Sequence, residues 1–178
     1  MKIINARLRH KTALYTLELQ DGLIKSIVPQ SEKQTADTHD IDAQQKLIIP
    51  PFVEPHIHLD ATLTAGEPEW NMSGTLFEGI ARWSQRKESV TVEDTRQRAL
   101  KTIGMLRDNG VQHVRTHIDV TDPSLTALEA MLQVKKEAAH LIDLQIVAFP
   151  QEGIQSFPAG RELMARAIEM GSVVVGGI

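Results

Sequence analysis

The chain has 178 residues, a formal net charge of −4 at pH 7 and no cysteine. Its charges are mixed and form no blocks, so it lacks the basic stripe that neutralises phosphates, and we expect neither a nucleic acid nor a membrane as partner. Without cysteine, disulfides and thiolate ligands are excluded, and any metal must be held by histidine and carboxylate. The N-terminus has no apolar run typical of a signal peptide, so we expect a cytoplasmic protein.

The first 46 residues predict a small β module. Short strands run from Ile3 to Val28, and the turn Gln20-Asp21-Gly22 between apolar runs indicates a hairpin. The segment from Pro29 to Gln45 is polar, and we expect a loop there, with one further short strand near His39 to Ile41. Residues 1–46 are therefore predicted to form a separate segment.

From residue 47 onward, apolar strands alternate with amphipathic helices. Strands are predicted at Leu47 to His58, Gln112 to Asp119, Asp143 to Phe149 and Ser172 to Ile178. A long loop from Asp60 to Gly74 follows the first of them. Continuous apolar strands separated by helices are typical of a parallel sheet covered by helices.

Four helices are predicted between and after these strands. The first runs from Thr75 to Lys87, with Trp83 expected in the core. The second is capped by Thr91, buries a stripe of Ala99, Leu100, Ile103 and Leu106, and stops at Asn109-Gly110. The third begins at Asp122-Pro123 and buries Leu125, Leu128 and Leu132, and the fourth runs from Ala159 to Met170.

The repeated strand and helix pattern suits either a doubly wound sheet or a (β/α)8 barrel. Neither a glycine-rich dinucleotide turn nor a phosphate-binding loop follows any strand, which favours the barrel. We therefore predict an α/β fold in which residues 47–178 form four βα units, the first half of such a barrel.

His56 and His58 are the strongest candidates for a metal site. Alternate residues of a strand project to the same face, about 6.6–6.8 Å apart, so two imidazoles can converge on one ion. They stand at the carboxyl end of an apolar strand, where barrel enzymes place their active sites, and Asp60 takes the next position on that face. The alternative is that both are hydrogen-bonded polar residues at a strand end.

Polar residues also end the next two strands. His117 is expected to line the same pocket, or else to be a hydrogen-bonded residue at a strand end. Gln151 and Glu152 follow the third strand, and a carboxamide both donates and accepts, as recognition of an amide-like ring edge requires. The alternative for these two is a turn that faces water.

The segment from Val53 to Asp60 resembles the first-strand motif of the amidohydrolase superfamily. Further motifs are similar to the bacterial cytosine deaminase family: Pro50-Pro51-Phe52, Thr64-Ala65-Gly66, Trp70-Asn71, Ser73-Gly74-Thr75-Leu76-Phe77-Glu78-Gly79-Ile80, Val114-Arg115-Thr116-His117 and Val147-Ala148-Phe149-Pro150-Gln151-Glu152-Gly153. The resemblance implies a β-sandwich for residues 1–46 and hydrolytic deamination of cytosine to uracil and ammonia by metal-activated water.

The resemblance also implies roles for individual residues. His56 and His58 would bind a catalytic Fe²⁺ or Zn²⁺, Gln151 would hydrogen-bond the pyrimidine ring, and Leu76 and His117 would line the pocket. The other metal ligands and the proton-shuttling glutamate of the family lie on later strands, beyond Ile178. We therefore expect a truncated chain, with no catalytic acid or base of its own, that is inactive alone and acts as a homo-oligomer or with a complementing chain.

Two other functions remain open on the sequence. One is a related amidohydrolase acting on another nitrogen heterocycle, such as isoguanine, an ammelide or creatinine. The other is a non-catalytic half-barrel that dimerises or binds a partner through its open sheet.

Overall fold

The computed structural model describes residues 1–172 and 174–177, and it divides the chain into two compact units, Met1–Pro50 and Pro51–Ile178. Both strands and helices are present, which confirms the predicted α/β character. Within the described residues, the helices are all too short or too polar to cross a bilayer.

The first unit is a small β-sheet. Its strands are β1 (Lys2–Leu8), β2 (Leu14–Gln20), β3 (Leu23–Pro29), β4 (Ile41–Asp42) and β5 (Leu47–Ile48). They are arranged in the order β3-β2-β1-β4, with β5 also paired to β1. The predicted hairpin is confirmed, because Asp21 and Gly22 both have positive φ between the antiparallel β2 and β3.

A buried asparagine holds the long loop of this unit. The Asn5 side chain donates to the Gln34 carbonyl at 2.8 Å and to Asp42 at 2.9 Å, and it accepts from the Gln34 N–H at 2.9 Å. The predicted loop from Pro29 to Gln45 is therefore ordered by one polar residue of β1. The predicted strand near His39 to Ile41 is β4.

The predicted single strand from Leu47 to His58 was wrong. Leu47 and Ile48 pair in parallel with β1, whereas a separate strand, β6 (Phe52–Ile57), pairs with the second unit's sheet. Pro50 and Pro51 separate them, because proline has no N–H to donate to a strand ladder. His58 lies directly after β6.

The second unit contains a parallel sheet with the order β6-β7-β8-β9. The other strands are β7 (Val111–Asp119), β8 (Asp143–Phe149) and β9 (Val174–Val175). Ser172 precedes β9, while Val173 and Ile178 of the predicted fourth strand lie outside the described residues. The helices are α1 (Leu76–Lys87), α2 (Val92–Asp108), α3 (Thr126–Glu137) and α4 (Gly160–Met170), with a 3-10 turn at Ala138–His140.

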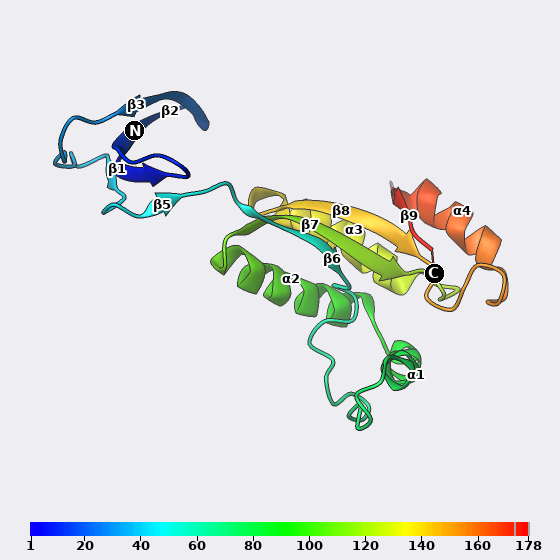
Figure 1. The fold of residues 1–178 in the computed structure, drawn as a ribbon. Coiled ribbons are helices and arrows are strands. Elements are labelled where there is room, and N and C mark those ends of the chain that lie inside the picture. The colour runs from blue at the N-terminus through cyan, green and yellow to red at the C-terminus, as the bar shows by residue number, and fades with distance from the viewer. Residues whose placement is uncertain (173, 178) are drawn as a thin grey trace. The chain divides into compact units, whose positions relative to one another are not determined.

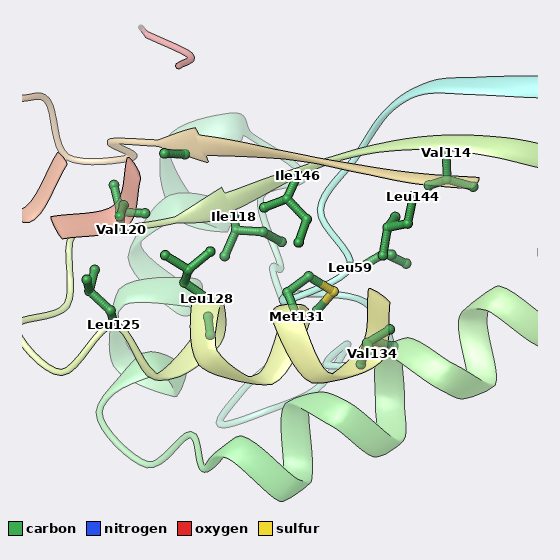
Figure 2. Packing of buried hydrophobic residues seen from close by; sticks show 14 of the residues in the cluster. Leu59, Val114, Ile118, Val120, Leu125, Leu128, Met131, Val134, Leu144 and Ile146 are labelled. Carbon is green, nitrogen blue, oxygen red and sulfur yellow. The ribbon is translucent and has the colours of Figure 1, made fainter. Parts of the chain in front are cut away.

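The core of the second unit lies between this sheet and its helices. Figure 1 shows α2 and α3 running along the sheet, and Figure 2 shows Leu128, Met131 and Val134 of α3 turned toward the strands. Ile118 of β7 and Ile146 of β8 meet them, and all five side chains are fully buried. Every second residue of β7 thus faces the helices, which leaves the residues between them for the opposite face of the sheet.

The second predicted helix is confirmed in detail. The Thr91 hydroxyl accepts a hydrogen bond from the Asp94 N–H at 3.1 Å, Asn109 is the C-cap, and Gly110 follows with φ of 84°. Of the predicted stripe, Ala99 and Ile103 are fully buried, whereas Leu100 and Leu106 are half-buried and pack against the same core. The fourth helix is confirmed as well, and it ends at Gly171 with φ of 122°.

The predicted start of the third helix was wrong. The helix begins at Thr126 rather than at Pro123, and Leu125, with φ of 54°, stands before it. Asp122 accounts for the difference, since its carboxylate accepts from the Ser124 N–H at 3.0 Å and from the Thr126 N–H at 2.9 Å. A short polar side chain that bonds nearby backbone groups favours a turn over a helix.

The expectation that Trp83 lies in a core was also wrong. Helix α1 has no buried residue, Trp83 is half-buried, and Phe77 is 83% exposed. The N-terminus of α1 is nevertheless capped by hydrogen bonds. The Thr75 hydroxyl accepts from the Glu78 N–H at 3.3 Å, and the Glu78 carboxylate accepts from the Ser73 N–H at 2.7 Å. Helix α1 is therefore held by polar contacts.

Candidate metal centre

Three imidazoles gather at the carboxyl ends of β6 and β7. His56 and His58 have ring centroids 5.4 Å apart, and the His117 ring lies 3.8 Å from that of His56 and 5.8 Å from that of His58. His117 faces this way because its neighbours Thr116 and Ile118 are buried on the helical side of β7. The structure thus brings together the three histidines that the sequence predicts at one rim.

The pair His56 and His58 has the donor chemistry and spacing for two ligands of one ion. With metal–nitrogen distances of about 2.0–2.1 Å, two imidazoles at tetrahedral positions have ring centroids about 5 Å apart. His117 does not add a third ligand in this arrangement, because its ring stacks on His56 with planes inclined by only 15°. Among the residues that the structure describes, no group of three or more potential ligands converges.

The electrostatics favour neutral imidazoles. Burial and the neighbouring His56 lower the pKa of His58, and burial together with His56 and His58 lowers the pKa of His117. Neutral imidazole is the form that binds a metal. The Nδ1 atom of His117 is buried and has no hydrogen-bond partner within the described part of the chain, so it can still form one hydrogen bond at this rim.

A buried carboxylate lies behind the histidines. Asp60 is 1% exposed, and its Oδ1 is 3.9 Å from the Nδ1 of His58, while its Oδ2 accepts from the Asp119 N–H at 2.8 Å. Burial raises the pKa of Asp60 to about 7. The Thr116 hydroxyl accepts from the Leu59 N–H at 3.0 Å, so the backbone on the C-terminal side of His58 is tied to β7.

A second polar cluster lies near the histidines, and of its residues the sequence indicated only Glu152 as part of a site. The ammonium of Lys87 in α1 lies 3.1 Å from Asp119 at the end of β7 and 2.7 Å from Glu152 in the turn after β8. The indole N–H of Trp83 donates to the same Asp119 oxygen at 3.0 Å. We call Trp83, Lys87, Asp119 and Glu152 the lysine cluster. The sequence signal for it is that Asp119 ends one strand and Glu152 lies in the turn after the next.

Of the two remaining predicted site residues, Gln151 lies at the same end of the sheet as the histidines. Gln151 is half-buried in the turn after β8, where its N–H donates to the Phe149 carbonyl at 3.1 Å. The Phe149 ring packs edge-on against His58, with centroids 5.4 Å apart, so this turn adjoins the histidines. Leu76 begins α1 and is 75% exposed, and its role as a pocket wall stays a prediction.

Histidines, carboxylates and a carboxamide thus lie at the carboxyl ends of parallel strands, the place where the active sites of α/β barrel enzymes lie. A family model described as the amidohydrolase family matches residues 40–170, and the chain belongs to that family.

Two individual proteins show which amidohydrolases this chain is similar to. A crystal structure of 5-methylcytosine deaminase from Klebsiella pneumoniae, liganded with 5-fluorocytosine, is 78% identical with a TM-score of 0.97, over 99% of this chain and 43% of that one. N-isopropylammelide isopropyl amidohydrolase of Pseudomonas sp. (strain ADP) is 32% identical over 99% of this chain and 44% of its own length.

A crystal structure of N-isopropylammelide isopropylaminohydrolase from Burkholderia multivorans has a TM-score of 0.75 at 24% identity, over 99% of this chain and 44% of that one, which indicates a shared fold. The chain therefore spans less than half the length of each of these relatives.

Proposed function

We propose that this chain is the metal-binding portion of a cytosine-deaminase-type hydrolase that converts cytosine, or a 5-substituted cytosine, to the corresponding uracil and ammonia. One observation carries the proposal: this chain is 78% identical to a 5-methylcytosine deaminase over 99% of its length. The pair His56 and His58 at the end of β6, with ring centroids 5.4 Å apart, is the feature of this chain that suits such chemistry.

In this proposal His56 and His58 hold one divalent ion, Fe²⁺ or Zn²⁺. Members of the amidohydrolase superfamily use a divalent metal. When bound, such an ion lowers the pKa of a coordinated water and so supplies hydroxide at neutral pH. Neutral imidazoles are the donors such an ion needs, and burial lowers the pKa of His58.

The pyrimidine would lie beside the turn after β8. The carboxamide of Gln151 both donates and accepts, which matches the adjacent N–H and C=O groups along a pyrimidine edge. His117 and, across the site, Leu76 would contact the ring. Addition of water at C4 followed by loss of the exocyclic amine as ammonia needs an acid/base group, which we assign to a part of the enzyme outside these residues.

We further propose that residues 51–178 are the first half of a (β/α)8 barrel and that residues 1–50 belong to an accompanying β-sandwich. The boundary moves from residue 46 to residue 50 because Leu47 and Ile48 pair with β1. The parallel order β6-β7-β8-β9, with helices along one face, is what four consecutive βα units of a barrel give. A completed barrel would place the histidines at its carboxyl-end rim. In that arrangement other strands, from a complementing chain or segment, cover the open face of the sheet.

A chimera tests the proposed function. The chain is joined to the part of the Klebsiella enzyme that it does not match, and the product is called the chimera below. We expect it to bind a divalent metal and to release ammonia from 5-methylcytosine or cytosine. Replacing His56 or His58 by Asn should abolish both metal binding and ammonia release, whereas the exposed His140→Asn should change neither. A chimera that folds and binds metal but deaminates no pyrimidine would contradict the proposal.

One relative supports a second candidate substrate class. The Pseudomonas protein at 32% identity is an N-isopropylammelide isopropyl amidohydrolase, so a triazine ring is the alternative. Ammonia and alkylamine release from a panel of pyrimidines, isoguanine, creatinine and ammelides distinguishes the two. We expect cytosines to be the preferred substrates.

A further inference from the structure

One side of helix α1 makes polar contacts with the end of β7 and with the turn after β8. Trp83 donates its indole N–H to Asp119 at 3.0 Å, Ser84 lies 3.5 Å from Glu152, and Lys87 reaches both carboxylates. These three α1 residues are adjacent or one turn apart, so they lie on the same side of the helix. Since α1 has no buried residue, these contacts are its attachment on this side.

The ammonium of Lys87 is the centre of the cluster. It donates to Asp119 at 3.1 Å, to the Thr121 carbonyl at 2.9 Å, to the Thr121 hydroxyl at 3.1 Å and to Glu152 at 2.7 Å. The Lys87 side chain is 15% exposed and that of Asp119 is 1% exposed. Burial opposes the charge, but hydrogen bonding to Glu152 and the charge of Asp119 outweigh it and raise the pKa of Lys87.

This one ammonium connects the two parts of the candidate site. Glu152 directly follows Gln151, so a contact that holds Glu152 also restrains the turn that carries the proposed pyrimidine ligand. Asp119 is the partner on β7, and its N–H donates to Asp60, whose other oxygen lies 3.9 Å from His58. Within the described residues, the hydrogen bonds and ion pairs of Lys87 do not include any of the three histidines.

We propose that Lys87 is a positioning residue, which fixes the turn after β8 through Glu152 and so orients Gln151 toward the substrate. The inference rests on the proposed function for its kinetic consequence. Its structural part, that Lys87 orders this turn, stands on the contacts alone.

The geometry requires lysine specifically. An ammonium is a compact donor that can satisfy several acceptors arranged around one point, whereas the guanidinium of arginine is a planar fork. The acceptors here come from two separate segments: Asp119 and Thr121 at the end of β7, and Glu152 in the turn after β8. The Phe157 ring, with its centroid 5.7 Å from the ammonium nitrogen, lies against another side of the ammonium group. We therefore expect Arg to replace Lys87 poorly.

The first test is a double-mutant cycle in the chimera. Lys87→Met should lower kcat/KM by about 10- to 100-fold, mainly through KM, because a misplaced binding group loses that much. Metal content should stay at the unsubstituted level. Gln151→Ala alone should lower kcat/KM by more than Lys87→Met does. The double variant should lose little more than Gln151→Ala alone, since Lys87 acts through Gln151. Lys101→Met, at an exposed lysine of α2, is the control.

The second test does not depend on activity. Hydrogen exchange of the backbone amides from 151 to 153 should quicken in Lys87→Met and in Glu152→Gln, and remain unchanged in Lys101→Met, while exchange in α3 stays constant. This result would support the positioning role even if the chimera had no deaminase activity. Unchanged exchange in the turn, multiplicative losses in the cycle, or parallel loss of metal would each overturn the inference.

Discussion

The Thr116 hydroxyl offers a direct test of how β7 supports the histidines. Thr116 and Leu59 are both fully buried, and the Leu59 N–H donates to the Thr116 hydroxyl at 3.0 Å. Thr116→Val keeps the side-chain shape but removes the acceptor, which leaves a buried N–H unpaired. Such an orphaned group costs about 1–3 kcal/mol, so we expect the free energy of unfolding to fall by that amount.

The matched control is Thr95→Val, the same change at another fully buried threonine. The Thr95 hydroxyl accepts from Arg98 Nη2 at 3.3 Å, but the same nitrogen also donates to the Asp94 carboxylate at 3.0 Å. Removing the Thr95 hydroxyl therefore leaves no donor without a partner. We expect a loss of less than about 1 kcal/mol for this variant.

Urea unfolding of the chimera, followed by circular dichroism with unchanged m-values, measures both losses. Zinc titration supplies a second measurement, because Leu59 directly follows His58 and a loosened backbone there should weaken the metal site. Affinity should fall in Thr116→Val and stay constant in Thr95→Val. Equal losses of stability in the two variants would refute the reasoning, because the orphaned N–H would then contribute nothing.

Three further predictions concern the helices. Ile103→Ala should lower the free energy of unfolding by about 2–5 kcal/mol, whereas Met105→Ala, 53% exposed on the same helix, should change it by less than about 0.5 kcal/mol in urea unfolding. Asp122→Ala should cost about 0.5–2 kcal/mol by the same measurement, while Asp122→Asn, which keeps an acceptor for the Thr126 N–H, should cost less. Hydrogen bonds lower the pKa of Glu78 to about 2 from 4.5. The stability that its carboxylate gives the start of α1 is therefore present above pH 4.5 and lost as the pH falls toward 2. Tryptophan fluorescence should report this pH-dependent change, and Glu78→Gln should remove it.

Local signals were enough to predict many of the elements. The hairpin at Asp21-Gly22, the cap at Thr91 and the stop at Gly110 each depend on a conformation or a hydrogen bond within a few residues. Alternation along a strand likewise predicted that His56, His58 and His117 would meet at one rim. The structure brings their rings within 6 Å of one another.

Other features depended on competition between local and distant contacts. The apolar run from Leu47 to His58 predicts one strand, but Pro50 and Pro51 interrupt the ladder, and the two halves pair with different sheets. Trp83 sits on a helix whose pattern suggests a buried stripe, yet its indole N–H binds Asp119, 36 residues away. Periodicity indicates that one face of a helix is apolar, but it does not indicate which surface of the protein that face will pack against.

The sequence by itself thus determined the order of the elements, the side of β6 on which His56 and His58 lie, and the family. Each follows from residue type and spacing, which act over a few residues. Only the tertiary structure decided that Lys87 joins Asp119 to Glu152, residues that lie 32 and 65 positions from it in the chain. No spacing rule predicts such a contact, because it arises from the way separate elements come together around a shared charge.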